Sequence, residues 1–189
     1  MKTISDYLQS KATGRNVLIA LGLLLAIGLS FNLIFTPIYQ QAAAGFAPFD
    51  VQFPLTREMI IIQLGAAGEN TFAAYLPFAI LDMPFPIIAG TFTALFWAWL
   101  IAKAGSASLR GAYQRGWWIW AFFPVACDLA ENYAFLSILH AHPEPLIDMI
   151  DFAVVVHRGK FVFVAISQGV TLVLMVATLV MWLRRRKPN

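Results

Sequence analysis

The sequence is poor in charged residues and almost without cysteine. Charged residues make up 12% of its 189 residues and hydrophobic residues 60%, whereas a soluble domain carries roughly 25% charged residues. The single cysteine, Cys127, excludes a small fold held together by internal disulfides. Nucleophile-elbow, P-loop and dinucleotide-binding motifs are absent as well. A water-soluble globule with one of these chemistries is therefore excluded.

The positive charge is too small and too dispersed for nucleic-acid binding. The net charge is +3, and no basic run is interleaved with aromatic residues outside the last few positions. We therefore expect membrane lipids as partners, with other membrane-protein chains as further candidates, and no nucleic acid. The sequence indicates no particular cofactor.

Long apolar runs are what the sequence has in abundance. About 20 apolar residues cross the hydrocarbon core of a bilayer as a helix. The sequence predicts four such spans in a single domain that covers residues 1–189, and their ranges are 16–36, 84–102, 116–139 and 161–183. The predicted fold class is an all-α integral membrane protein, a bundle of four transmembrane helices.

The second apolar run is longer than one straight span requires. It begins near Thr71 and is interrupted by Pro84 and Pro86, which lack backbone donors and restrict the residues that precede them. We therefore expect residues 71–81 to form a helix in or near the membrane interface. Together with the apolar piece at residues 59–64, this helix makes residues 37–83 a long outer loop with short interfacial helices.

Positive charge sets the expected orientation. With the N-terminus inside, ten of the thirteen Lys and Arg residues lie on the cytoplasmic side, as the positive-inside rule requires. These ten are Lys2, Lys11, Arg15, Lys103, Arg110, Arg115, Arg184, Arg185, Arg186 and Lys187. We expect both termini in the cytoplasm and place the protein in a bacterial inner membrane.

The most informative residues are carboxylates at membrane depth. Asp128 and Glu131 lie inside the third span and are followed by Asn132, and their spacing puts all three on one helix face. An ionisable group in hydrocarbon costs several kcal/mol, so such residues face the bundle interior and are functional candidates. If the protein is an enzyme, Asp128 and Glu131 are the predicted acid and base, with Asp82 as a further candidate.

Polar groups of all four predicted spans fall at a similar height, below the outer surface. At 1.5 Å per residue, Glu131 lies roughly 22 Å along the third span, and the other spans place small or polar residues near that level. We predict a polar pocket that opens outward. Its expected ligand-binding residues are Asn32, Asp82, Asp128, Glu131, Asn132, Ser167, Gln168 and Thr171.

The sequence places no lysine or arginine at the depth of this acidic pair. Arg158 and Lys160 precede the fourth predicted span and are therefore expected in the outer loops, as is Arg57. Without a counter-ion the two carboxyls would share a proton and titrate as a unit. Arg57 or Arg158, folded down from the outer loops, is the alternative that would make the pair structural.

The three histidines are expected on the outer side of the membrane. His140, His142 and His157 are weak candidates for a metal site, because their spacing matches no established zinc motif. We therefore predict no metal. Cys127 is expected to be a small packing residue rather than a nucleophile.

Three functions remain open from the sequence. The first is a protein that binds a lipid-like or hydrophobic ligand in the acidic pocket, or that serves as an accessory subunit of a membrane complex. The second is an intramembrane enzyme that uses Asp128 and Glu131 for acid-base chemistry on a lipid-like substrate. The third is a proton-coupled transporter or a channel subunit.

Overall fold

The computed structural model describes residues 2–68 and 70–186, and these residues are helical with no strands. Lys187, counted above among the cytoplasmic cations, lies outside them. The elements in chain order are α1 (Lys2–Lys11), α2 (Gly14–Ser30), the π-helix η1 (Phe31–Phe35), α3 (Thr36–Ala42), the 3-10 helix η2 (Phe49–Val51), α4 (Arg57–Gly65), α5 (Thr71–Asp82), α6 (Pro84–Ala104), α7 (Ala107–Gln114), the 3-10 helix η3 (Trp117–Phe122), α8 (Phe123–His140) and α9 (Ile147–Arg186).

Four of the resulting helical stretches are long and apolar enough to cross a membrane, which confirms that part of the prediction. They run over Gly14–Ala42, Thr71–Ala104, Trp117–His140 and Ile147–Arg185. Within the most apolar window of the first and the last of them, only 11% of the residues are buried inside the chain. These two helices therefore present apolar side chains to their surroundings.

The helix ends follow from local sequence. Thr13 and Ser106 accept hydrogen bonds from the backbone N–H groups three residues ahead and so cap α2 and α7. Gly105 ends α6 in the left-handed conformation, with φ of 66°, which glycine adopts without steric penalty. The chain can therefore reverse between α6 and α7 within two residues.

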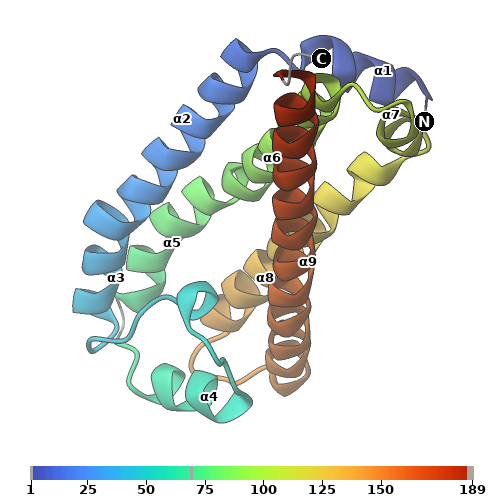
Figure 1. Cartoon of the computed structure of the whole chain (residues 1–189). Coiled ribbons are helices and arrows are strands. Elements are labelled where there is room, and N and C mark those ends of the chain that lie inside the picture. The colour runs from blue at the N-terminus through green and yellow to red at the C-terminus, as the bar shows by residue number, and fades with distance from the viewer. Residues whose placement is uncertain (1, 69, 187–189) are drawn as a thin grey trace.

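The prolines at residues 84 and 86 do not separate α5 from α6 as the sequence suggested. Met83 between the two helices keeps helical dihedral angles, φ −60° and ψ −48°, and both prolines fall in the first turn of α6, where a missing N–H is tolerated. Figure 1 shows α5 and α6 following one another along one line through the molecule. Residues 71–82 thus extend the second long helix instead of lying across the end of the bundle.

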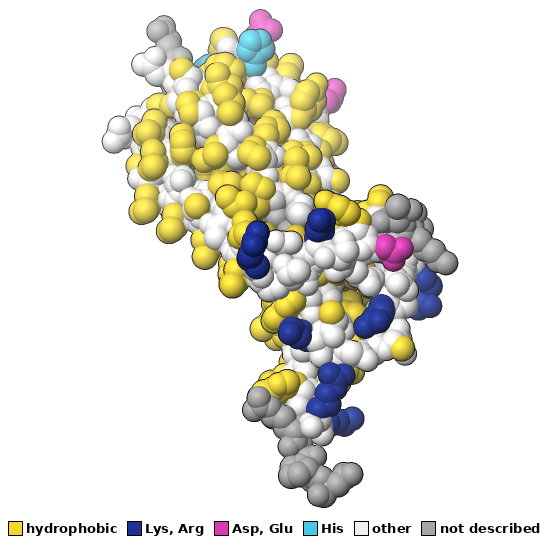
Figure 2. All heavy atoms as spheres, turned by 90° about the horizontal axis from the view of Figure 1, so that it is seen from above, with side chains coloured by type: hydrophobic (Ala, Val, Ile, Leu, Met, Phe, Trp, Pro, Cys, Tyr) yellow, Lys and Arg dark blue, Asp and Glu magenta, His cyan; other side chains and the backbone are white. Residues whose placement is uncertain are grey.

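The helices form a bundle with its two ends clearly distinguished. α8 packs along α9, and α6 contacts α2, α8 and α9. Both termini lie at one end with α1 and α7, whereas α4 and the loops around it lie at the other end (Figure 1). Seen from above, Lys and Arg side chains gather around the terminal end (Figure 2).

Two apolar clusters fill the bundle. One lies towards α4 and contains Tyr39, Phe49, Tyr75, Phe78, Phe135 and Ile150. The other lies towards the termini and contains Leu8, Trp97, Leu100, Tyr113 and Leu174. Between the two clusters, α8 and α9 carry a small group of polar residues on the faces they turn to one another, and the candidate site lies in this intermediate layer.

Candidate functional site

The site is built from one face of α8, one face of α9 and three shorter contributions. α8 supplies Asp128, Glu131 and Asn132, as the three- and four-residue spacing predicted. α9 supplies His157 and Lys160, which share a face for the same reason. The 3-10 helix η2 adds Asp50, the loop after it adds Gln52, and α5 ends at Asp82. These elements are far apart in sequence and meet only in the folded chain.

Glu131 and His157 form a fully buried pair. The Nδ1 atom of His157 lies 2.5 Å from Oε1 of Glu131, both side chains have 0% exposure, and Nε2 lies 2.8 Å from the carbonyl oxygen of Gln52. A carbonyl only accepts, so Nε2 of His157 carries a proton. The imidazole ring therefore joins the carboxyl group of Glu131 to the backbone of the loop after η2.

Lys160 joins the two carboxylates of α8. Its Nζ atom lies 3.0 Å from Oδ1 of Asp128 and 2.5 Å from Oε2 of Glu131, and it also donates to the carbonyl oxygen of Asp50 at 3.3 Å. The prediction that no lysine reaches the acidic pair is therefore wrong. Arg57, one of the two alternative counter-ions, instead pairs with Asp151 near the surface.

Lys160 and His157 were placed outside the fourth predicted span for a simple physical reason. Residues 147–160 carry several charges, so hydropathy starts the fourth span at residue 161, although α9 begins at Ile147. His157 and Lys160 thus lie on the long helix and not in a loop. The three-residue spacing of a histidine and a lysine next to an apolar run is the one signal in the sequence that points to them.

Asp50 and Asp82 form a second acidic group that lacks such partners. Asp50 is 9% exposed and Asp82 4% exposed, and neither Oδ1 of Asp50 nor Oδ2 of Asp82 has a hydrogen-bond partner among the described residues. The hydroxyl of Tyr75 and the amide of Asn132 are unpartnered too. Burial, and secondarily the charge of Asp82, raises the pKa of Asp50 well above its usual range.

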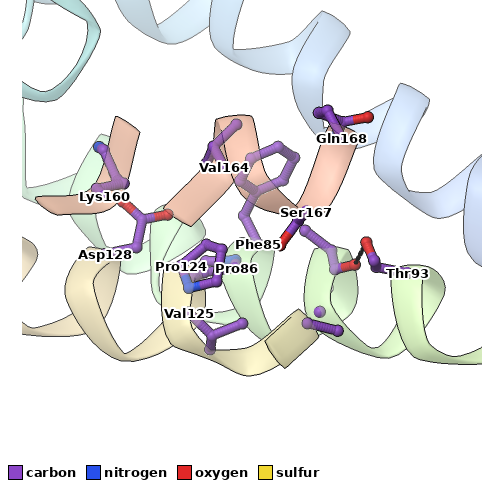
Figure 3. A pocket seen from close by; sticks show the side chains of 13 residues that line it. Phe85, Pro86, Thr93, Pro124, Val125, Asp128, Lys160, Val164, Ser167 and Gln168 are labelled. Atoms are coloured by element: carbon purple, nitrogen blue, oxygen red, sulfur yellow. Dashed lines mark hydrogen bonds and ion pairs between the residues drawn. The ribbon is translucent and has the colours of Figure 1, made fainter. Parts of the chain in front are cut away.

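Two cavities adjoin the Asp128–Lys160 ion pair. The first, of about 150 Å³, lies between α6, α8 and α9, and the second, of about 360 Å³, lies between η1, α5 and α9. Asp128 and Lys160 line both cavities, and their side chains are 16% and 12% exposed. In Figure 3 these two side chains point towards one another at one end of the first cavity, whose nearby walls are Pro86, Pro124 and Val164. A molecule that enters either cavity therefore meets this pair, while Glu131 and His157 lie behind it.

The remaining predicted ligand residues fall into two groups. Asn32 lines the second cavity, and Ser167 and Gln168 line the first. Thr171 lines neither cavity and accepts a hydrogen bond of 2.7 Å from Nε1 of Trp97. Asn132 is fully buried and lines neither cavity, and its side-chain amide lies next to the carboxyl group of Asp82.

The histidines are not assembled into a metal site. His157 is buried in the pair with Glu131 on the long helix α9 and is not a solvated loop histidine, whereas His140 is exposed and packs against the ring of Phe72. His142 lines a shallow pocket with Pro143, away from the acidic layer. Among residues 2–68 and 70–186, no group of three His, Cys, Asp or Glu side chains has an arrangement that could hold a metal ion.

Comparison with known proteins identifies no relative of this chain. Neither a protein-family model, nor a curated protein, nor a solved structure matches this chain.

Proposed function

We propose that the four long apolar helices cross a bacterial inner membrane, with both termini in the cytoplasm. The length and apolarity of the helices support this. So does the gathering of Lys and Arg side chains around the terminal end (Figure 2), as the positive-inside rule requires. α4 and the loops near it then lie on the outer side.

We further propose that the protein binds an amphipathic, lipid-like molecule in the cavities beside Asp128 and Lys160. One observation carries this proposal: a single partly exposed ion pair forms a common wall of two cavities whose other lining is mostly apolar. Binding sites for small molecules have this composition, with apolar walls and a few polar groups that fix orientation. The polar end of the ligand meets the ion pair, and its apolar part lies along Phe85 and Val164, which also line both cavities.

Glu131 and His157 act as support for the ion pair in this proposal. Oε2 of Glu131 contacts Nζ of Lys160, and His157 holds the opposite oxygen of the same carboxylate. Because both side chains are fully buried, they fix the position of Lys160 without touching the ligand. If these polar side chains served only to join the helices, the ion pair of Asp128 and Lys160 would not need to line the cavities.

An intramembrane enzyme is the second candidate. A continuous series of polar contacts runs from His157 through Glu131 and Lys160 to Asp128, which reaches both cavities. Such a series can carry a proton to or from a bound molecule, as acid-base catalysis requires.

The accessory-subunit function is favoured instead by the exposed apolar faces of the first and last long helices. For the proton-coupled transporter, the cluster around Trp97 and Tyr113 on the terminal side is unfavourable, because it fills the path to that end.

Native mass spectrometry of the full chain released from lipid nanodiscs tests the binding proposal. We expect the wild type to carry a lipid-sized mass that is lost in Asp128→Asn. Asp151→Asn is the matched control, because this aspartate lies on α9 in an exposed ion pair with Arg57. Equal retention by Asp128→Asn and the control, or no bound mass on the wild type, would contradict the proposal. Additional protein chains in the spectrum would favour the accessory subunit, and altered lipids in the extract would favour the enzyme.

A further inference from the structure

The second cavity combines carboxylates with aromatic walls. It lies between the first long helix and α9, and four phenyl rings and three carboxylates contribute to its lining. These residues are Phe31, Phe78, Phe85, Phe161, Asp50, Asp82 and Asp128. Ring faces attract organic cations, most strongly when both groups are removed from water.

The carboxyl groups around this cavity outnumber the basic side chains that reach them. The polar layer holds four carboxyl groups, those of Asp50, Asp82, Asp128 and Glu131, against the two basic side chains of His157 and Lys160. Both bases are engaged by Asp128 and Glu131. One side-chain oxygen each of Asp50 and Asp82 remains without a hydrogen-bond partner among the described residues, although both side chains are at least nine-tenths buried.

A buried polar atom without a partner is rare in folded proteins and points to a missing ligand, water or ion. Here two such atoms belong to carboxylates that line the same cavity. A transition metal does not fit, because the described residues form no group of three metal-ligating side chains. The phenyl rings that complete the cavity offer no ligand to a metal but suit a large, weakly hydrated cation.

From this arrangement we infer that the second cavity binds an organic ammonium group, held between Asp50 and Asp82 and enclosed by phenyl rings. The inference rests on the proposed binding of an amphipathic molecule and names the chemistry of its polar end. Gly28, Asn32 and Val164 line the same cavity, and Asn32 and Val164 are exposed. The apolar tail leaves the cavity past these residues, so the cation is carried by a lipid-like molecule.

Titration calorimetry with a cationic and a neutral probe tests this inference. The full chain in nanodiscs of phosphatidylglycerol, a lipid without an ammonium group, is titrated with dodecyltrimethylammonium and separately with dodecanol, and empty nanodiscs serve as the blank. We expect the ammonium probe to bind at least about tenfold more tightly than dodecanol, as charge-assisted contacts to two carboxylates imply. Asp82→Asn should remove most of this difference, and Asp151→Asn should preserve it.

Two further measurements show whether the cation must be carried by a lipid-like molecule and which proposal a negative result contradicts. Tetramethylammonium, which has no tail, should bind much more weakly than the tailed probe, and equal binding would overturn a lipid-borne cation. If circular dichroism shows that Asp82→Asn does not fold, Asp50→Asn replaces it in the same comparison. Equal binding of dodecanol and the ammonium probe, unchanged in the Asp82 or Asp50 variant, would overturn the ammonium inference and leave amphiphile binding intact. If neither probe binds and no mass is lost in Asp128→Asn, the proposed function itself fails.

Discussion

At the scale of single residues, the polar layer is a case of buried charges stabilised by one another. Glu131 and His157 are inaccessible to solvent, and each has a partner on both of its polar ends. Lys160 is mostly buried as well and is held by two carboxylates. Such a network adds little to stability as a whole, but the removal of one partner leaves an uncompensated buried charge.

Replacing Glu131 by glutamine should therefore destabilise the protein strongly. The substitution leaves Lys160 and His157 without their shared carboxylate, and we expect a loss of about 3–5 kcal/mol in the free energy of unfolding. Thermal unfolding of the detergent-solubilised chain, followed by circular dichroism, measures this. Asp151→Asn, in the exposed pair with Arg57, should change stability by less than about 1 kcal/mol. A Glu131→Gln protein that unfolds at the wild-type temperature would contradict the structural role of this carboxylate.

Asp50 makes stability depend on pH in a defined direction. With no cation bound, the pKa of Asp50 is raised in the folded protein, chiefly by burial, so the folded state holds a proton that the unfolded state releases above about pH 4. The stabilisation from this proton is present at low pH and is lost as pH rises towards the folded-state pKa. The ionisable groups that act on it electrostatically are Asp82, Asp128, Glu131, Lys160, Tyr39 and Tyr75.

Asp50→Asn should accordingly flatten the pH dependence of unfolding. Asparagine resembles the protonated acid, so the variant keeps its stability where the wild type loses it, from about pH 4 upwards. Unfolding temperatures measured across this range, with exposed Asp148→Asn as the control, provide the check. A wild-type curve that rises with pH in this range, or a variant with the same slope as the wild type, would contradict this prediction.

At the scale of secondary-structure elements, the position of the first cavity depends on how closely α6 approaches η3 and α8. Gly90 of α6 lies against η3 and α8. A Cβ atom added to Gly90 would be 2.5 Å from Cγ2 of Val125 and 3.1 Å from the carbonyl oxygen of Ala121. All three residues line the first cavity. The glycine therefore sets both the packing of these elements and the shape of the cavity wall.

Gly90→Ala should push these elements apart. We expect a cost of about 1–3 kcal/mol from overpacking, together with weaker retention of the bound mass in native spectra. Gly169→Ala is the matched control, because nothing lies within 4 Å of a Cβ at this position of α9. The control should be neutral or slightly stabilising, since alanine is the better helix former. Equal stability of the two variants would show that the helices accommodate the extra carbon.

At the scale of the whole molecule, the polar layer is enclosed between two apolar clusters. The cluster around Tyr75 and Phe135 closes it towards α4, and the cluster around Trp97 and Tyr113 closes it towards the termini. The two cavities lie at the level between these clusters, among α5, α6, α8, α9 and η1. In a membrane, this arrangement favours entry of a ligand from the side, through the lipid.

The proposed topology predicts which loops a thiol reagent can reach from outside. In a Cys127→Ser background, Glu144→Cys lies in the α8–α9 connection and Ser108→Cys lies on α7, both at exposed positions. In intact cells, a membrane-impermeant maleimide should label the cysteine at position 144 and reach the one at position 108 only after lysis. The reverse pattern would place the termini outside, and labelling of both would contradict four membrane crossings.

The sequence by itself determined the helical class, the four long apolar helices and the acidic face of α8. These features depend on local composition and on spacing along one helix, which are fully present in the chain. The same reasoning predicted pocket positions for Asp128, Asn32, Ser167 and Gln168, and each of these residues lines at least one of the two cavities.

Only the tertiary structure decided which charges meet. Nε2 of His157 contacts the carbonyl of a residue 105 positions away, and Lys160 reaches Asp128 from the neighbouring helix. A residue's charge is visible in the sequence, but its partner is fixed by the packing of separate helices. Hydropathy counts Lys160 and His157 as unfavourable in a span, whereas the ion pairs they form with α8 allow them to be buried there.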